Sequence, residues 1–163
     1  MKRRPPAGRR PNLPVASQHR NGKRETVLHA RVLVADNHAE TRELLFTILK
    51  TEGYDVGLAE DGDLALQRYR ERAADVVLMD LLMPGKDGVT TISEFCAEFP
   101  GITIVAMSGD TGTAWHDLLA DARTAGARLT LRKPLEPWVL LRALEGLLAA
   151  RKSLSVGALH RSA

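Results

Sequence analysis

Short apolar runs alternate along the chain with longer segments in which apolar residues recur every three or four positions. The runs are of strand length and rich in Val, Ile and Leu, and they lie at residues 32–34, 54–59, 76–79, 102–107 and 129–131. The segments that follow them are typical of helices with one buried face, such as the segment with Ile92, Phe95, Cys96 and Phe99.

Glycine and proline separate these segments. Gly53, Gly126 and the pair Pro100-Gly101 each follow a periodic segment and are expected to end a helix. The last two predicted helices cover residues 113–125 and 136–150. Strands and helices that alternate in this way, five of each, predict an α/β protein with a doubly wound, five-stranded parallel sheet. The flavodoxin-like strand order 2-1-3-4-5 is one of two common solutions, and it places a binding site where strands 1 and 3 end.

Charge divides the 163-residue chain into three parts. Residues 1–29 hold eight Lys and Arg against one Glu, with four prolines and no apolar period, which predicts a disordered basic tail. Residues 30–150 carry the whole strand and helix pattern and an excess of acidic residues, so we expect one domain there. Residues 151–163 are predicted to form a short C-terminal tail.

The basic tail bears on the choice of partner. Its arginines could contact phosphates, but no aromatic residue is interleaved among them to stack on bases. We therefore expect no nucleic-acid partner, and a solubilising leader is the simpler interpretation of the tail. The acidic domain suits a protein partner with basic patches.

Cysteine content and hydropathy bear on the compartment. Cys96 is the one cysteine, so no disulfide can form within the chain, and its apolar neighbours indicate a small core residue. No apolar run approaches the roughly 20 residues that span a bilayer. The basic N-terminal segment lacks the apolar stretch of a secretory signal. We expect a cytoplasmic protein without a membrane partner.

Polar side chains follow four of the five predicted strands. Asp36 and Asn37 follow the first strand, Asp80 the third, Ser108 the fourth and Lys133 the fifth. Each has an ordinary interpretation by itself, as a helix cap, a turn residue or a solvated charge. In a doubly wound sheet, however, all four strands end at one edge. The sequence therefore predicts a site with two carboxylates, an amide, a hydroxyl and an ammonium.

These groups are suited to phosphoryl chemistry. A hard divalent ion such as Mg²⁺ would relieve the repulsion between Asp36 and Asp80. With the ion and the Lys133 ammonium neutralising phosphoryl oxygens, Asp80 could attack an activated phosphate and become an acyl phosphate. The Ser108 hydroxyl could then hydrogen-bond a phosphoryl oxygen and draw the end of its strand inward.

Several stretches resemble the receiver domains of two-component response regulators. VLVADNHAETRELL and AEDGDLAL look like the family's first two strand-to-helix segments, and DVVLMDLLMPGKDG looks like its phosphoacceptor segment. IVAMSGD looks like the fourth strand with its switch hydroxyl, and GARLTLRKPL like the lysine-proline segment. The resemblance runs in order from residue 30 to about residue 150, and the D-x-x-M-P-x-x-D-G and K-P residues are its most specific part.

The resemblance implies a role for each matched residue. Asp80 becomes the phosphoacceptor and Asp36 an acidic-pocket residue for Mg²⁺. The backbone carbonyl of Leu82 becomes a metal ligand. Ser108 becomes the switch hydroxyl and Lys133 the partner of the phosphoryl group, with a cis peptide bond between Lys133 and Pro134.

Two residues depart from the family pattern. The family usually has a second acidic residue, a direct metal ligand, where this chain has Asn37. An amide oxygen can still coordinate, but the site loses one negative charge, so we expect weaker Mg²⁺ binding. Thr130 stands where the family usually has a Tyr or Phe that moves inward with the switch hydroxyl. Either this coupling is muted or another surface reports the signal.

The resemblance implies a stand-alone receiver that a histidine kinase or a phosphotransferase phosphorylates on Asp80. Its own chemistry would be limited to self-phosphorylation and slow hydrolysis. It would signal to a downstream protein through the face formed by the fourth strand, the fourth helix and the fifth strand, at residues 102–107, 113–125 and 129–131.

Other classes of function stay open at this point. Asn37 and Thr130 are compatible with a pseudo-receiver, an interaction module that works without phosphorylation. Binding of nucleic acid through residues 1–29 is a weaker alternative. An aspartyl phosphohydrolase shares the acidic residues but would need a cap segment over its substrate, for which the sequence offers no candidate.

Overall fold

Five parallel strands form one sheet in the computed structural model, which describes residues 30–109 and 114–159. The strands are β1 (Arg31–Ala35), β2 (Asp55–Ala59), β3 (Val76–Asp80), β4 (Ile104–Ser108) and β5 (Leu129–Arg132). Their order across the sheet is β2-β1-β3-β4-β5, and neighbouring strands pair in parallel throughout. The predicted fold class and strand order are confirmed.

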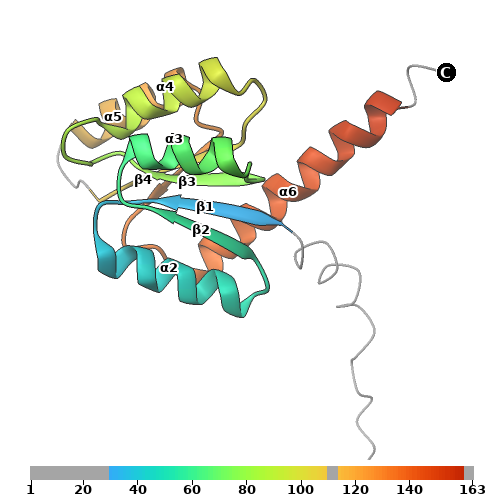
Figure 1. Ribbon diagram of the computed structural model, residues 1–163, viewed down its shortest axis with the longest axis horizontal. Coiled ribbons are helices and arrows are strands. Elements are labelled where there is room, and N and C mark those ends of the chain that lie inside the picture. Colours follow the sequence, from blue (N-terminus) through green and yellow to red (C-terminus); the bar gives the residue numbers. More distant parts are fainter. Residues whose placement is uncertain (1–29, 110–113, 160–163) are drawn as a thin grey trace, which may run out of the picture.

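Helices cover both faces of this sheet (Figure 1). They are α2 (Ala39–Thr51), α3 (Gly62–Glu71), α4 (Gly88–Glu98), α5 (Ala114–Ala125) and α6 (Pro137–Leu159). α2 and α6 lie on one face, and α3, α4 and α5 lie on the other. In the described ranges no helix is both long enough and apolar enough to cross a membrane.

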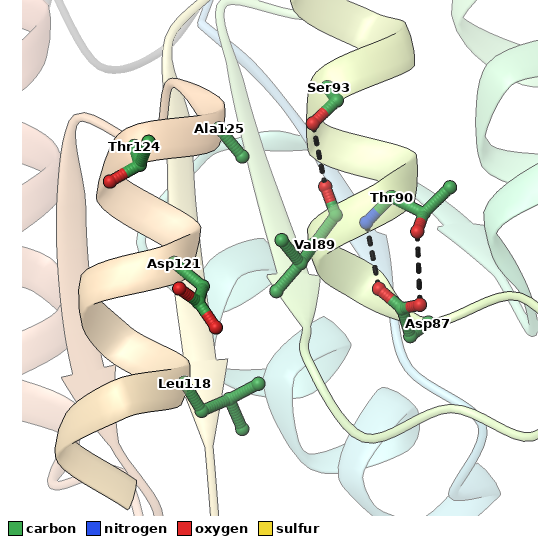
Figure 2. Close-up of a pocket in the computed structure, with 8 residues that line it drawn as sticks. All are labelled: Asp87, Val89, Thr90, Ser93, Leu118, Asp121, Thr124 and Ala125. Carbon is green, nitrogen blue, oxygen red and sulfur yellow. Dashed lines mark hydrogen bonds between the residues drawn. The ribbon is translucent and has the colours of Figure 1, made fainter.

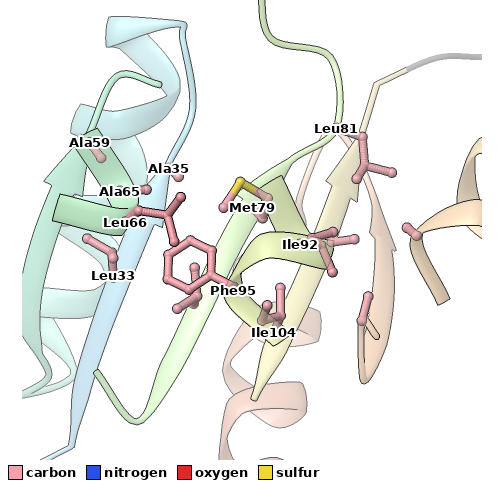
Figure 3. Close-up of a cluster of buried hydrophobic side chains, with 14 of the residues drawn as sticks. Leu33, Ala35, Ala59, Ala65, Leu66, Met79, Leu81, Ile92, Phe95 and Ile104 are labelled. Carbon is pink, nitrogen blue, oxygen red and sulfur yellow. The ribbon is translucent and has the colours of Figure 1, made fainter. Parts of the chain in front are cut away.

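Alternate side chains of each strand point to opposite faces, so the sheet has two cores. Along β1, Val32 and Val34 pack with α2 and α6, whereas Leu33 and Ala35 pack with the other layer. Figure 3 shows the second core, in which the ring of Phe95 from α4 is fully buried. Full burial of a large apolar side chain contributes about 1.5–3 kcal/mol. A shift of one residue in any central strand would lose these contacts on both faces, so the positions of the strand ends are fixed.

Two helices begin at an aspartate that precedes a glycine. The carboxylate of Asp61 accepts a hydrogen bond from the Leu64 N–H (2.7 Å) at the start of α3. The carboxylate of Asp87 does the same with the Thr90 N–H (2.7 Å) at the start of α4. Such a cap contributes about 1 kcal/mol. The cap at Asp87 also fixes where the loop that follows β3 must end.

α6 is longer than the sequence pattern indicates. We expected this helix to end at residue 150, but it continues to Leu159, so the predicted end of the helix is wrong. No proline follows residue 150. Arg151 donates to the backbone carbonyl of Asp75 (2.8 Å) and pairs with its carboxylate (3.4 Å), which ties the extension to the loop before β3. The predicted basic tail, residues 1–29, lies outside the described residues, as do residue 113 and residues 160–163.

Candidate functional site

The predicted polar residues meet at the edge where the strands end. Asp36 follows β1, Asp80 and Ser108 are the last residues of β3 and β4, and Lys133 follows β5. Asp36 and Ser108 are fully buried, and Asp80 is 1% exposed. Carboxylates buried this deeply are stable only when other groups offset their charge.

The ammonium group of Lys133 lies between the two carboxylates. Its Nζ is 2.5 Å from Asp36 Oδ2 and 3.1 Å from Asp80 Oδ2. The backbone N–H of Lys133 donates to the carbonyl oxygen of Ser108 (2.8 Å), which joins β5 to the end of β4. The cis peptide bond predicted between Lys133 and Pro134 is present. Two ionised carboxylates and one ammonium leave one uncompensated negative charge, so the pocket favours a further cation.

Backbone groups around the end of β1 hold Asp36 in place. Its N–H donates to the carbonyl oxygen of Ala59 at the end of β2 (3.2 Å), and its own carbonyl accepts from Arg42 Nη1 (2.7 Å). Its Oδ1 accepts from the backbone N–H of His38 (2.9 Å). Oδ2 is thereby turned toward Lys133.

Burial raises the pKa of the Asp80 carboxyl above its ordinary value. The positive charge of Lys133 opposes this shift, and the negative charge of Asp36 adds to it. The Lys133 hydrogen bond and the Leu82 N–H, 3.4 Å from Asp80 Oδ1, also oppose it. The pKa stays raised overall, so the folded protein holds a proton at Asp80 more tightly than the unfolded chain does.

The Asp80→Asn variant is expected to unfold at a temperature about 2–4 °C higher than the unaltered protein at pH 7 without added metal. The pKa of Asp80 is higher in the folded protein than in the unfolded chain. The stability associated with this carboxyl is therefore lost as the pH rises from the ordinary pKa of the group through its pKa in the folded protein. The difference in unfolding temperature between Asp80→Asn and the unaltered protein should therefore shrink as the pH falls toward about 4. Thermal unfolding of both proteins between pH 4.5 and 8 measures this difference. A difference that grew at low pH would contradict the prediction.

The side chain of Asn37 lies against the same pocket. In the orientation that satisfies its neighbours, its amide nitrogen donates to the Leu82 carbonyl oxygen (3.2 Å), Asp80 Oδ2 (3.3 Å) and His38 Nδ1 (3.1 Å). The Leu82 carbonyl and the Asp80 carboxylate are two of the ligands that the resemblance predicts for a metal ion. The partial positive charge of the N–H₂ group that faces both of them offsets part of the negative charge that a metal ion would neutralise.

The donor set fits a magnesium ion. Asp36 and Asp80 offer carboxylate oxygens and Leu82 a carbonyl oxygen, and Asn37 would offer its amide oxygen once the amide turned over. Hard oxygen donors that carry excess negative charge are those that Mg²⁺ prefers. These are the residues predicted from the sequence, and the structure places them together.

His38 is a residue that sequence reasoning missed. One group of histidine, cysteine and carboxylate side chains in the described ranges could hold a metal ion, and it consists of Asp36, His38 and Asp80. One potential ligand atom from each of the three residues lies within 4.8 Å of the others. The only signal in the sequence is the position of His38 two residues after Asp36, in the loop that leads into α2.

Gly88 allows the loop after β3 to lie close against the end of that strand. Its N–H donates to the carbonyl oxygen of Leu81 (3.2 Å). A Cβ at this position would overlap the backbone oxygen of Asp80 and lie 2.7 Å from the Leu81 Cα. In the sequence, Asp87-Gly88 is part of the D-x-x-M-P-x-x-D-G motif, but the motif does not show that two backbone segments approach closely at Gly88.

A shallow hollow of about 580 Å³ lies between α4 and α5, apart from the carboxylate pocket (Figure 2). Asp87 and Asp121 line it together with Thr90 and Thr124, and Leu118 lies at one end. The hollow therefore combines two carboxylates with apolar side chains, since Val89 and Ala125 line it as well.

Comparison with known proteins decides the family. Residues 32–145 match the response regulator receiver domain. The chain belongs to this family. Receiver domains are the signalling domains of two-component systems.

Individual relatives support the same assignment. The receiver is 34% identical over 115 residues to the chemotaxis protein CheY of Thermotoga maritima, which covers 70% of this chain and 93% of that protein. It is 34% identical over 110 residues to the DNA-binding response regulator MtrA of Mycobacterium tuberculosis, which covers 68% of this chain and 46% of that protein. The chain thus spans about half the length of the MtrA relatives that it matches.

Solved structures share the fold. The receiver superposes on the chemotaxis protein CheY4 of Vibrio cholerae with a TM-score of 0.68 and 26% identity, over 73% of this chain and 98% of that one. It superposes on the CheX-CheY-BeF₃-Mg²⁺ complex from Borrelia burgdorferi with a TM-score of 0.66 and 26% identity, over 72% of this chain and 88% of that one. That complex contains Mg²⁺.

Proposed function

We propose that this receiver accepts a phosphoryl group on Asp80 from a histidine kinase or a phosphotransferase. The observation that carries the proposal is the position of Asp80, a buried carboxylate at the end of β3, 3.1 Å from Lys133 Nζ and beside Asp36. An ammonium at this distance can bind a phosphoryl oxygen as readily as it binds the carboxylate. The raised pKa of Asp80 indicates that its ionised carboxylate is poorly stabilised in the unphosphorylated protein.

The reaction conserves the phosphoryl group. One carboxylate oxygen of Asp80 forms a bond to phosphorus while the phosphorus–nitrogen bond of a phosphohistidine breaks, and the departing imidazole takes up a proton. When bound, Mg²⁺ would offset the negative charge of the phosphoryl oxygens. The residues that would hold it are Asp36, Asp80 and Leu82 through its carbonyl, with Asn37 as a weakened fourth. Catalysis by the receiver itself stops at this self-phosphorylation and at slow hydrolysis of the acyl phosphate.

The intact mass of the protein after incubation with acetyl phosphate and Mg²⁺ tests the proposal. The unaltered protein should gain one phosphoryl group, about 80 Da, and Asp80→Asn should gain none. Asp63→Asn is the matched control, because Asp63 is an exposed carboxylate that pairs with Lys86 outside the pocket. Phosphorylation of Asp80→Asn would mean a different acceptor. No uptake by natively folded protein would overturn the proposal.

Failure of uptake would favour a pseudo-receiver, for which Asn37 is the specific observation. Its amide nitrogen already bridges the Leu82 carbonyl and Asp80, so a metal ion has to displace hydrogen bonds that an aspartate would not make. The whole protein would then act through its surface without phosphotransfer.

Asn37→Asp is expected to bind Mg²⁺ about tenfold more tightly than the unaltered protein. The substitution adds a negative charge beside Asp80 and Leu82 and removes the N–H₂ group that faces them. Isothermal titration with MgCl₂ measures the difference. Equal affinities would show that Asn37 takes no part in the metal site.

We further propose that phosphorylation is reported through the face formed by β4, α5 and β5. Ser108 ends β4, and its carbonyl accepts from Lys133 N–H (2.8 Å), so movement at the phosphoryl site reaches both strands. In β5, the Thr130 hydroxyl accepts from Arg123 Nη2 of α5 (3.0 Å). This bond provides a route from β5 to α5 at the position where the family usually has an aromatic switch residue.

A protein with basic patches is the proposed downstream partner. The hollow beside α5 is bordered by Asp87 and Asp121, which would accept a basic side chain. A cytoplasmic location, where a kinase and such a partner are both found, belongs to the proposal. The expectation of no nucleic-acid partner concerns residues 1–29, outside the described part of the chain, and stays a prediction.

A further inference from the structure

The imidazole of His38 faces the carboxylate pocket. Its Nδ1 is 3.3 Å from Asp36 Oδ1, and one of its ring nitrogens lies within 4.8 Å of ligand atoms of both Asp36 and Asp80. The residue precedes α2 in extended conformation (φ −86°, ψ 114°), and its side chain makes no capping hydrogen bond to that helix. The ring is therefore not used to begin α2.

A backbone hydrogen bond fixes the position of the His38 Cα, whereas the imidazole ring is free to rotate. The His38 N–H donates to Asp36 Oδ1 (2.9 Å), which holds the residue beside the carboxylate. The side chain is 65% exposed, so the ring can turn toward a cation in the pocket without repacking the core. The Asn37 amide nitrogen lies 3.1 Å from Nδ1 and marks the side of the ring that faces Asp80 and Leu82.

The ligand types in the pocket differ from a pure oxygen set. Asn37 supplies no charge where the family usually supplies a carboxylate, which weakens the attraction for Mg²⁺, a cation that strongly prefers oxygen. A neutral imidazole nitrogen binds Mn²⁺, Co²⁺ and Ni²⁺ much better than it binds Mg²⁺, with affinity rising in that order. The chain thus lacks a negative charge that favours Mg²⁺ binding and has a nearby nitrogen ligand that transition metals favour.

We infer that His38 supplies a nitrogen ligand to this pocket, so that the receiver binds a divalent transition-metal ion in preference to Mg²⁺. The inference rests on the metal site of the proposed function and adds to it the identity of a ligand and the class of ion.

Metal titrations of the unphosphorylated protein test the inference with three variants. The unaltered protein, His38→Gln, Asn37→Asp and His116→Gln are titrated at one pH with MgCl₂, MnCl₂ and CoCl₂ by calorimetry. The Co²⁺ absorption spectrum and the nitrogen coupling in pulsed EPR of bound Mn²⁺ report the imidazole directly. His116 in α5 is the matched control, since it belongs to no potential metal-binding group in the described part of the chain.

The expected result is a specific loss at His38. His38→Gln should bind Co²⁺ about tenfold more weakly, with Mg²⁺ affinity little changed and the nitrogen coupling lost. His116→Gln should behave like the unaltered protein, and Asn37→Asp should recover Mg²⁺ affinity.

Two results would overturn the inference, and they can be told apart. If Mg²⁺ and Co²⁺ both bind and His38→Gln changes neither affinity nor spectra, His38 is not a ligand, while the metal site of the proposed function stands. If no variant binds any of the three ions, the metal site itself fails.

Discussion

Lys133→Met is expected to lower the free energy of unfolding by about 3–5 kcal/mol and to abolish phosphorylation by acetyl phosphate. The substitution keeps much of the apolar stem but removes the ammonium from between Asp36 and Asp80. Two buried carboxylates would then repel each other without a compensating charge. Urea denaturation measures the stability, and intact mass measures the phosphorylation.

Control variants distinguish the effect on stability of removing a buried charge from that of removing an exposed one. Lys86→Met removes an ammonium that pairs with the exposed carboxylates of Asp63 and Glu94, so it should cost about 0–1 kcal/mol. Adding Asp80→Asn to Lys133→Met should restore part of the stability but none of the phosphorylation. A Lys133→Met protein as stable as Lys86→Met would contradict the picture of a buried ion pair.

Gly88→Ala is expected to destabilise the fold by about 3 kcal/mol and to distort the site. The added Cβ would overlap the backbone oxygen of Asp80 and lie 2.7 Å from the Leu81 Cα, and backbone atoms cannot move aside as the end of a flexible side chain can. The loop would have to lift away, and the carbonyl of Leu82 would move with it. Urea denaturation and Mg²⁺ titration together measure both effects.

Gly146→Ala provides the matched control for this substitution. Gly146 lies in α6, and a Cβ there would meet no atom within 4 Å. Alanine is favoured over glycine within a helix by about 1 kcal/mol, so this variant should be more stable than the unaltered protein. If Gly88→Ala kept native stability and Mg²⁺ affinity, the close approach at Asp80 would have no structural importance.

The candidate site could be predicted from the sequence because parallel strands end at one edge. Once the apolar runs before Asp36, Asp80, Ser108 and Lys133 are recognised as strands, the topology brings the residues together whatever their separation in the chain. The same reasoning predicted helices on both faces of the sheet, whereas it left two common strand orders open.

The sequence by itself determined the alternation of strands and helices, because local apolar periodicity follows from which faces are buried. The tertiary structure alone decided three features. α6 extends past residue 150 to Leu159, and Arg151 in this extension contacts Asp75, 76 positions away in the chain. Gly88 is required because two backbone segments approach closely, and His38 faces the carboxylates because the backbone turns after Asp36. The first two features depend on distances between atoms of segments far apart in the chain, which no local pattern encodes.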